Sequence, residues 1–286
     1  MELLCPAGSM EALRAAVQNG ADAVYLGCGV FNARMGAHNF SADELQEAVV
    51  YCHVRGVKVH LTLNTLVSDR EMARAADVVR TAAILGVDAF IVQDLGMIDL
   101  CREIAPHIPI HASTQMSIHS LEGVQQARDL GCTRVVLARE LPRQEIARIC
   151  AKSPVEIEMF VHGALCMCYS GQCYLSSVIG RRSGNRGQCA QPCRLPYGYG
   201  RFEPDRYPLS LRDNCLIERL GELERMGVAS LKIEGRMKRP EYVAVVTKLY
   251  RAALNGKRIT PADLAELEAV FSREGFTQGY YDGKIG

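Results

Sequence analysis

Short apolar segments alternate with amphipathic segments along almost the whole chain. The apolar segments have the length and composition of buried strands, while the segments between them repeat apolar residues every three to four positions, as helices do. We expect strands at Glu2–Leu4, Ala23–Gly27, Lys58–Asn64, Ala89–Gln93, Pro109–Ser113, Arg134–Ala138, Val155–Val161 and Ser230–Ile233. We expect helices that include Ser9–Asn19, Ala42–Arg55, Asp69–Leu85, Leu121–Leu130, Pro142–Ala151, Leu216–Met226, Pro240–Leu254 and Thr260–Phe271. This alternation predicts a parallel sheet with crossover helices.

One unit recurs in this pattern: the end of a helix, a glycine, and a short apolar strand. Its copies read NGADAVYLG, RGVKVHLTLN, LGVDAFIVQD, LGCTRVVLAR and MGVASLKIEG. Glycine commonly ends a helix because it adopts the left-handed backbone without strain. The repetition favours an α/β fold of the (β/α)8 TIM-barrel type over a doubly wound sheet, and a chain of 286 residues is long enough for such a barrel.

The barrel is expected to occupy residues 1–255, with a cysteine-rich insertion at residues 163–215 after the seventh strand. Residues 256–286 would form a C-terminal helical extension. The final FTQGYYDGKIG has neither a helix cap nor a polar tail. We therefore expect a longer native chain, with a further C-terminal domain or a partner protein beside the barrel.

Charge and composition restrict the possible functions. The 33 Lys and Arg residues balance 32 Asp and Glu residues, so any nucleic-acid site must be a local patch and not the whole surface. The opening MELLCPAGSMEAL does not have the form of a signal peptide, and no apolar run reaches the length of a membrane span. We expect a cytoplasmic protein without a membrane span, in which cysteines stay reduced.

Six of the 12 cysteines fall between Gly163 and Cys215. Their spacing is C-x-C, C-x4-C, a gap of 15 residues, C-x3-C, and then Cys215. Zinc ribbons use two tight C-x2-C knuckles, so this irregular set fits an iron-sulfur cluster better than zinc. Zinc and unligated redox cysteines remain alternatives. The other six cysteines stand singly in apolar surroundings and are expected to be buried, except Cys5 and Cys28, which lie where strands should end.

Several motifs resemble those of the collagenase-like peptidase family 32, a family of unknown catalytic type. They are LLCPAGSMEALRAAVQNGADAVYLG, FNARMGAHNF, HGALCMCYSGQCYLSS, NRGQCAQPCR, SLRDNCLIE and SLKIEGRMKRPEYVA. The resemblance implies a 4Fe-4S cluster held by Cys166, Cys173, Cys189 and Cys215, with Cys193 the rival of Cys215. Despite the peptidase name, it also implies oxygen-independent hydroxylation of a pyrimidine in rRNA or tRNA. The hydroxyl would come from a small organic donor such as prephenate.

The same family resemblance leaves other functions open. One is the peptidase activity of the family name, although the chain has no HExxH or GxSxG motif. Another is hydroxylation of a ubiquinone precursor. A third is an assembly or sensor module in which the cluster is structural.

Arginines without a neighbouring acid in the sequence surround the cysteines: Arg181, Arg182, Arg186, Arg194 and Arg201. They would offset the charge of a cluster, bind RNA phosphates, or form a solvated basic loop. Arg34 and Asn39, in the loop after the second strand, and Arg236, after the eighth, are further substrate-binding candidates.

Polar residues at the carboxyl ends of the strands should line the site, because TIM-barrel chemistry takes place on that face. By this rule the cavity should contain Cys5, Tyr25, Asn64, Gln93, Asp94, Ser113, Thr114, Gln115, Arg139, Glu140, His162, Glu234 and Arg236. His162 is the first candidate for proton transfer. Glu140 and Glu234 are candidate general bases, with ion pairing to Arg139 and Arg236 as the alternative.

Overall fold

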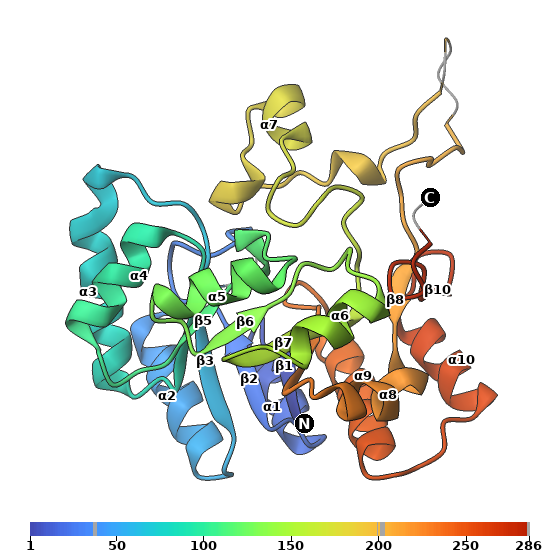
Figure 1. Ribbon diagram of the computed structural model, residues 1–286, viewed down its shortest axis with the longest axis horizontal. Helices are drawn as coiled ribbons and strands as arrows, with labels where there is room; N and C mark the ends of the chain where they lie inside the picture. The colour runs from blue at the N-terminus through green and yellow to red at the C-terminus, as the bar shows by residue number, and fades with distance from the viewer. Residues whose placement is uncertain (37–38, 199, 201–203, 285–286) are drawn as a thin grey trace.

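The computed structural model describes residues 1–36, 39–198, 200 and 204–284, and its central element is a closed barrel of parallel strands (Figure 1). Each strand pairs with its neighbour in sequence, and β9 closes the barrel by pairing with both β7 and β1. The strands are β1 Glu2–Pro6, β2 Ala23–Leu26, β3 Lys58–Leu63, β4 Ala89–Val92, β5 Ile110–Ala112, β6 Arg134–Val136, β7 Glu156–Gly163 and β9 Ser230–Ile233. The predicted TIM-type barrel is confirmed.

Helices follow the strands and surround the barrel (Figure 1). They are α1 Met10–Gln18, α2 Ala42–His53, α3 Met72–Leu85, α4 Leu95–Ile104, α5 Leu121–Asp129, α6 Arg143–Cys150, α8 Leu220–Met226 and α9 Pro240–Leu254. Ser9 and Asp94 cap the first turns of α1 and α4 through their side-chain oxygens. Gly86 and Gly227 end α3 and α8 in the left-handed conformation, as the recurring unit predicts.

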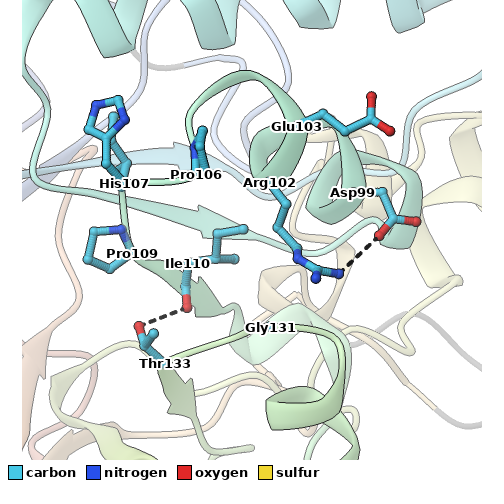
Figure 2. Close-up of a pocket in the computed structure, with 10 residues that line it drawn as sticks. Asp99, Arg102, Glu103, Pro106, His107, Pro109, Ile110, Gly131 and Thr133 are labelled. Carbon is cyan, nitrogen blue, oxygen red and sulfur yellow. Dashed lines mark hydrogen bonds and ion pairs between the residues drawn. The ribbon is translucent and has the colours of Figure 1, made fainter.

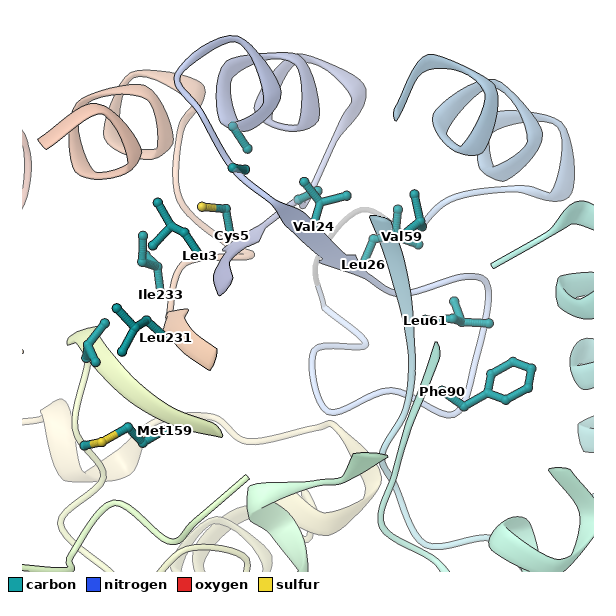
Figure 3. Packing of buried hydrophobic residues seen from close by; sticks show 14 of the residues in the cluster. Leu3, Cys5, Val24, Leu26, Val59, Leu61, Phe90, Met159, Leu231 and Ile233 are labelled. Atoms are coloured by element: carbon teal, nitrogen blue, oxygen red, sulfur yellow. The ribbon is translucent and has the colours of Figure 1, made fainter. Parts of the chain in front are cut away.

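The main apolar core lies between the outer faces of the strands and the helices (Figure 3). Leu3, Val24 and Leu61 are among the fully buried side chains of this layer. Cys5 belongs to it too, with its thiol accepting a hydrogen bond from Thr247, and burial raises the pKa of that thiol to about 12. Cys5 is therefore an inert core residue.

The interior of the barrel is polar by comparison. Its separate apolar cluster is limited to Leu4, Ala23, Tyr25 and Ile91. Below these residues, the fully buried Glu158 accepts hydrogen bonds from Lys232 Nζ at 2.8 Å and Arg134 Nη1 at 3.1 Å. Arg134 also pairs with Glu2 and Glu156. Opposite charges thus satisfy one another inside the barrel, as buried ions require.

The cysteine-rich segment leaves the barrel after β7 and rises above its mouth as a loop that contains α7 Leu175–Gly180 (Figure 1). It returns through β8 Asp213–Cys215, which pairs antiparallel with the end of β7. The C-terminal residues contain α10 Pro261–Val270 and β10 Phe276–Thr277, and β10 pairs with β8. No helix in the described part of the chain is long and apolar enough to cross a membrane.

Candidate functional site

A small cavity lies at the carboxyl ends of the barrel strands. It is lined by Tyr25, Ala33, Arg34, Thr62, Asn64, Ile91, Ser113, Thr114, Gln115, Val136, Arg139, Phe160, Lys232, Glu234 and Arg236. The strand-end rule is therefore confirmed for Tyr25, Asn64, Ser113–Gln115, Arg139, Glu234 and Arg236. It is wrong for Cys5, which lies in the outer core. Asp94 caps α4 instead, and Gln93 does not line the cavity but donates to the carbonyl of Gln115.

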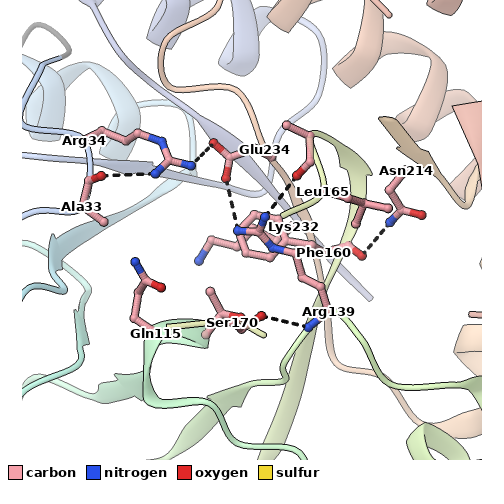
Figure 4. A network of polar contacts seen from close by, with 12 residues as sticks. Ala33, Arg34, Gln115, Arg139, Phe160, Leu165, Ser170, Asn214, Lys232 and Glu234 are labelled. Atoms are coloured by element: carbon pink, nitrogen blue, oxygen red, sulfur yellow. Dashed lines mark hydrogen bonds and ion pairs between the residues drawn. The ribbon is translucent and has the colours of Figure 1, made fainter. Parts of the chain in front are cut away.

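Glu234 is the central acid of this cavity (Figure 4). Arg34 Nη2 donates to its Oε1 at 3.1 Å, and Arg139 Nη2 lies 3.7 Å from Oε2. Burial raises the pKa of this carboxyl, but the positive charges of Arg34, Arg139 and Arg236 outweigh burial and hold it at about 2. Of the two roles expected for Glu234, general base or ion-pair partner, the structure shows the ion pair. Its principal partner is Arg34, distant in sequence, and not the expected neighbour Arg236.

Lys232 lines the cavity and also binds Glu158 inside the barrel, so it links the charges of the two regions. Its Nζ donates to Glu158 and lies 4.6 Å from the centre of the Tyr25 ring. Burial lowers the pKa of Lys232, while Glu158 raises it. Arg236, also buried, donates to Thr62 Oγ1 at 2.9 Å and Asn32 Oδ1 at 3.3 Å.

His162 does not line the cavity. The side chain is buried among Tyr242, Tyr250 and Phe276, and burial lowers the pKa of the imidazole to about 3. Tyr250 Oη lies 3.3 Å from Nδ1, whereas Nε2 has no hydrogen-bond partner. A catalytic role for His162 stays a prediction. From its buried position, His162 could act on a ligand in the cavity only through other residues.

Glu140 anchors the cysteine-rich loop. Its carboxylate accepts hydrogen bonds from the backbone N–H and the hydroxyl of Ser170, both at 2.9 Å. The expected pairing of Glu140 with Arg139 or Arg236 is absent from the ion pairs of the described residues. Arg139 instead donates to the carbonyl of Ala164, at the root of the same loop.

Five thiols of the loop lie within range of one another's charge: Cys166, Cys168, Cys173, Cys189 and Cys193. Burial raises the pKa of Cys193, Arg194 lowers it, and Cys166, Cys189 and Cys173 raise it further. A Cβ placed on Gly184 would lie 3.7 Å from the backbone oxygen of Cys173 and 3.9 Å from Cys189 Cβ, so the backbone brings these two residues to the same glycine. Among the described residues, however, no three metal-binding side chains converge as in an ion site.

Cys215 stands apart from these thiols. It is buried on β8, opposite His162, and its Sγ is 3.9 Å from Tyr250 Oη. Cys166, in contrast, is exposed, and the charge of its thiol raises the pKa of Arg34, after the larger effects of Glu234 and of burial.

The arginines of the loop differ in their surroundings. The expectation that no acid neutralises them is wrong for Arg186, which forms two hydrogen bonds with Glu71 and a third with the carbonyl of Leu66. Arg194 binds backbone carbonyls within the loop region. Arg181 and Arg182 are exposed, and Arg201 lies outside the described residues.

The loop after β2 holds Arg34 in place through asparagines. Asn32 Nδ2 donates to Asn39 Oδ1 at 2.8 Å, and Asn32 Oδ1 accepts from the backbone N–H of Arg34 at 3.0 Å. Asn39 thus positions the loop and is not among the residues that line the cavity.

A second, more open hollow lies at the opposite end of the barrel, where β5 and β6 begin (Figure 2). Its walls include Arg102, His107 and Thr133. Because TIM-barrel enzymes carry their chemistry at the carboxyl ends of the strands, this amino-terminal hollow is not the candidate active site.

A comparison with protein families places the chain in one of them. Residues 8–286 match the family described as peptidase family U32. The chain is 43% identical over 270 residues to the 23S rRNA 5-hydroxycytidine C2501 synthase of Escherichia coli, covering 93% of this chain but 41% of that protein. It is 37% identical to the tRNA hydroxylation protein P1 of Bacillus subtilis, covering 100% of this chain and 72% of that protein.

The solved structure of a U32 peptidase has the same fold. It superimposes with a TM-score of 0.57 at 13% identity, covering 82% of this chain and 93% of that one. At this identity the likeness concerns the fold.

Proposed function

Because the chain belongs to peptidase family U32, and because a cysteine-rich loop stands over a charged barrel cavity, we propose that it is the barrel of an RNA-modifying enzyme. The reaction would be hydroxylation of a pyrimidine in rRNA or tRNA. The names of the relatives from E. coli and B. subtilis support this choice. The observation that carries it is the hydrogen bond of 3.0 Å from Arg139, which lines the cavity, to the carbonyl of Ala164 at the root of the cysteine-rich loop.

Hydroxylation replaces a ring C–H by C–OH, a two-electron oxidation of the base, so the hydroxyl donor must be reduced by two electrons and a redox group is required to pass them. The thiols of the loop have the donor chemistry of an iron-sulfur site. A 4Fe-4S cluster would supply electron transfer there, held by Cys166, Cys173, Cys189 and Cys215. Cys193 competes with Cys215 for the fourth position, because it lies among the other loop thiols.

The local backbone supports thiolate ligands in this loop. The N–H of Gln191 donates to Cys189 Sγ at 3.3 Å. Such hydrogen bonds stabilise the negative charge of a ligating sulfur and tune its potential. Arg194, beside Cys193, adds a positive charge to the same region.

RNA would approach the loop side of the barrel. Arg181 and Arg182 are exposed and available for phosphate contacts, and Tyr169 and Tyr174 are exposed aromatic rings on which bases can stack. Arg186 is less suited to this role, because Glu71 already neutralises it. The target base would have to leave its stack to reach the mouth of the barrel.

The hydroxyl donor would be a small organic acid of the prephenate type. The cavity places Arg34, Arg139, Arg236 and Lys232 around a single lining carboxylate, Glu234. This excess of positive charge suits an anionic co-substrate.

The peptidase alternative receives no support from the cavity. Its hydroxyl groups are already engaged: Thr62 donates to the carbonyl of Leu26, and Thr114 to that of Leu137. Ser113 Oγ accepts from Asn64 and from the backbone of Gln115. None of the described lining residues is a cysteine or a histidine, so the cavity has no nucleophile beside a base.

Anaerobic purification followed by iron and sulfide assays tests the cluster. The account expects iron and acid-labile sulfide in the protein, and a marked loss of both when Cys173 is replaced by serine. Cys150→Ser is the matched control, because Cys150 lies on α6, away from the loop. A protein that stays free of iron after anaerobic reconstitution would refute the cluster.

A further inference from the structure

Positive charge exceeds negative charge around the mouth cavity. Arg34, Arg139, Arg236 and Lys232 all line it. Lys232 is balanced by Glu158 below the cavity. The three arginines face the one lining carboxylate, that of Glu234. Among the described residues, the cations within 4 Å of this carboxylate are Arg34 and Arg139 only. Two positive charges therefore remain without an opposite charge at the site.

Arg236 carries the clearest of these unbalanced charges. Its side chain is buried, and both of its printed partners, Asn32 and Thr62, are neutral. No ion pair among the described residues includes Arg236. Burying a charge without an opposite charge is costly, and costs of this kind are concentrated at functional sites.

Arg139 contributes an unused donor. Its Nε is buried and has no hydrogen-bond partner, although Nη1 donates to the carbonyl of Ala164. The guanidinium lies 4.3 Å from the centre of the Phe160 ring, which fixes its plane at the cavity wall (Figure 4). A buried N–H without a partner is rare in proteins, so this donor is suited to a bound acceptor.

The cavity is large enough for a small acidic group and too small for a nucleobase. Its volume is about 40 Å³, whereas one water occupies roughly 10–15 Å³ on this scale. A carboxylate group fits such a space, and its planar pair of oxygens matches the arginine fork. The bulk of the molecule that carries the carboxylate would extend through the mouth of the cavity.

We propose that this cavity binds a carboxylate of a small organic dianion on Arg236 and Arg139, and that Glu234 occupies one of these two arginines, Arg139, as an internal competitor when the site is empty. The incoming carboxylate takes the Arg139 contact from Glu234, which keeps its bond to Arg34. Only one part of this inference rests on the proposed function: that the bound dianion serves as the hydroxyl donor.

The effect of removing the charge of Glu234 distinguishes a competitor from a residue that orients the arginines. A residue that merely orients Arg34 and Arg139 for the ligand would weaken binding when its charge is removed. Removing the charge of a competitor would instead strengthen binding. It would free the two arginines that Glu234 holds, and it would also end the repulsion between Glu234 and the anionic ligand. The direction of the change therefore distinguishes the two roles.

Isothermal titration calorimetry of the anaerobically purified protein with succinate tests the proposal, with acetate as the monoanionic comparison. Wild-type protein should bind succinate more tightly than acetate. Arg236→Met should weaken succinate binding by about 10- to 100-fold, the usual consequence of losing a charged hydrogen bond. Glu234→Gln should strengthen it about threefold or more. Arg236→Lys, which keeps the charge, should retain part of the affinity.

Controls separate the site from the surface and from the fold. Arg186→Met removes an arginine already paired with Glu71 and should leave succinate binding unchanged. Circular dichroism verifies the fold of each variant, and Arg236→Lys serves if Arg236→Met does not fold. The absence of succinate binding, an unchanged affinity in both Arg236 variants, or weaker binding in Glu234→Gln would overturn the proposal.

The titration needs no RNA. Failure to bind succinate would leave RNA hydroxylation standing, whereas an unchanged nucleoside profile in cells would remove RNA hydroxylation and leave the anion site intact.

Discussion

Glu158→Gln is expected to destabilise the protein by about 3–5 kcal/mol, the usual cost of removing one partner from a buried ion pair. Glu158 is fully buried and accepts hydrogen bonds from Lys232 and Arg134. The neutral amide leaves Lys232 buried without an opposite charge, while Arg134 keeps Glu2 and Glu156. The loss therefore comes mainly from Lys232.

Glu156→Gln is the matched control, because Glu156 lies on the same strand and binds the same arginine. Its side chain is 57% exposed, so water screens the pair and the expected loss is at most about 1 kcal/mol. Urea denaturation measures both variants. With an m-value of about 3 kcal/mol/M, the midpoint should fall by about 1–2 M for Glu158→Gln and by less than about 0.3 M for Glu156→Gln. Equal shifts in the two variants would refute the reasoning.

Three further predictions concern the loop and the barrel interior. Cys215→Ser should lower the iron bound after anaerobic reconstitution and Cys193→Ser should not; the reverse result would assign the fourth ligand to Cys193. Burial lowers the pKa of His60 to about 4 and that of His111 well below 6.5, so the unfolded chain binds more protons below pH 6.5. The free energy of unfolding should then decrease with falling pH by about 1.4 kcal/mol per unit for each of these two histidines, and a flat profile between pH 6.5 and 5 in urea titrations would contradict this. Arg186→Met should speed hydrogen exchange in the cysteine-rich loop while leaving exchange in the barrel strands unchanged; unchanged exchange in the loop would show that this arginine does not hold it down.

The barrel could be predicted from the sequence because its strands and helices have regular periods. Each expected strand is present, and glycines such as Gly86 end helices where the recurring unit places them. The short strands β8 and β10 were not predicted. They contain three and two residues, too few for a pattern, and exist because β8 pairs with the end of β7.

The position of the site was also predictable, but the partners of its residues were not. The strand-end rule identified Arg139, Glu234 and Arg236, because the carboxyl ends of parallel strands meet at one face. The rule does not tell which charges pair, and the sequence neighbour Arg236 was a poorer guess for Glu234 than Arg34, 200 positions away. Arg34 reaches the cavity because the loop after β2 folds back through its asparagines.

His162 illustrates a second limit of the same rule. His162 lies near the carboxyl end of β7, at the mouth of the barrel. However, the pairing of β7 with β9 shifts register just before this residue. The side chain therefore packs among Tyr242 and Tyr250 and does not line the cavity. A single sequence contains no signal for such a local irregularity.

The most direct test of the central claim is mass spectrometry of the nucleosides of rRNA and tRNA from a strain that lacks the gene. The account predicts the loss of one hydroxylated pyrimidine and its return when the intact gene is restored, but not when the gene carries Cys173→Ser. A hydroxypyrimidine profile identical to that of the parent strain would contradict the assignment.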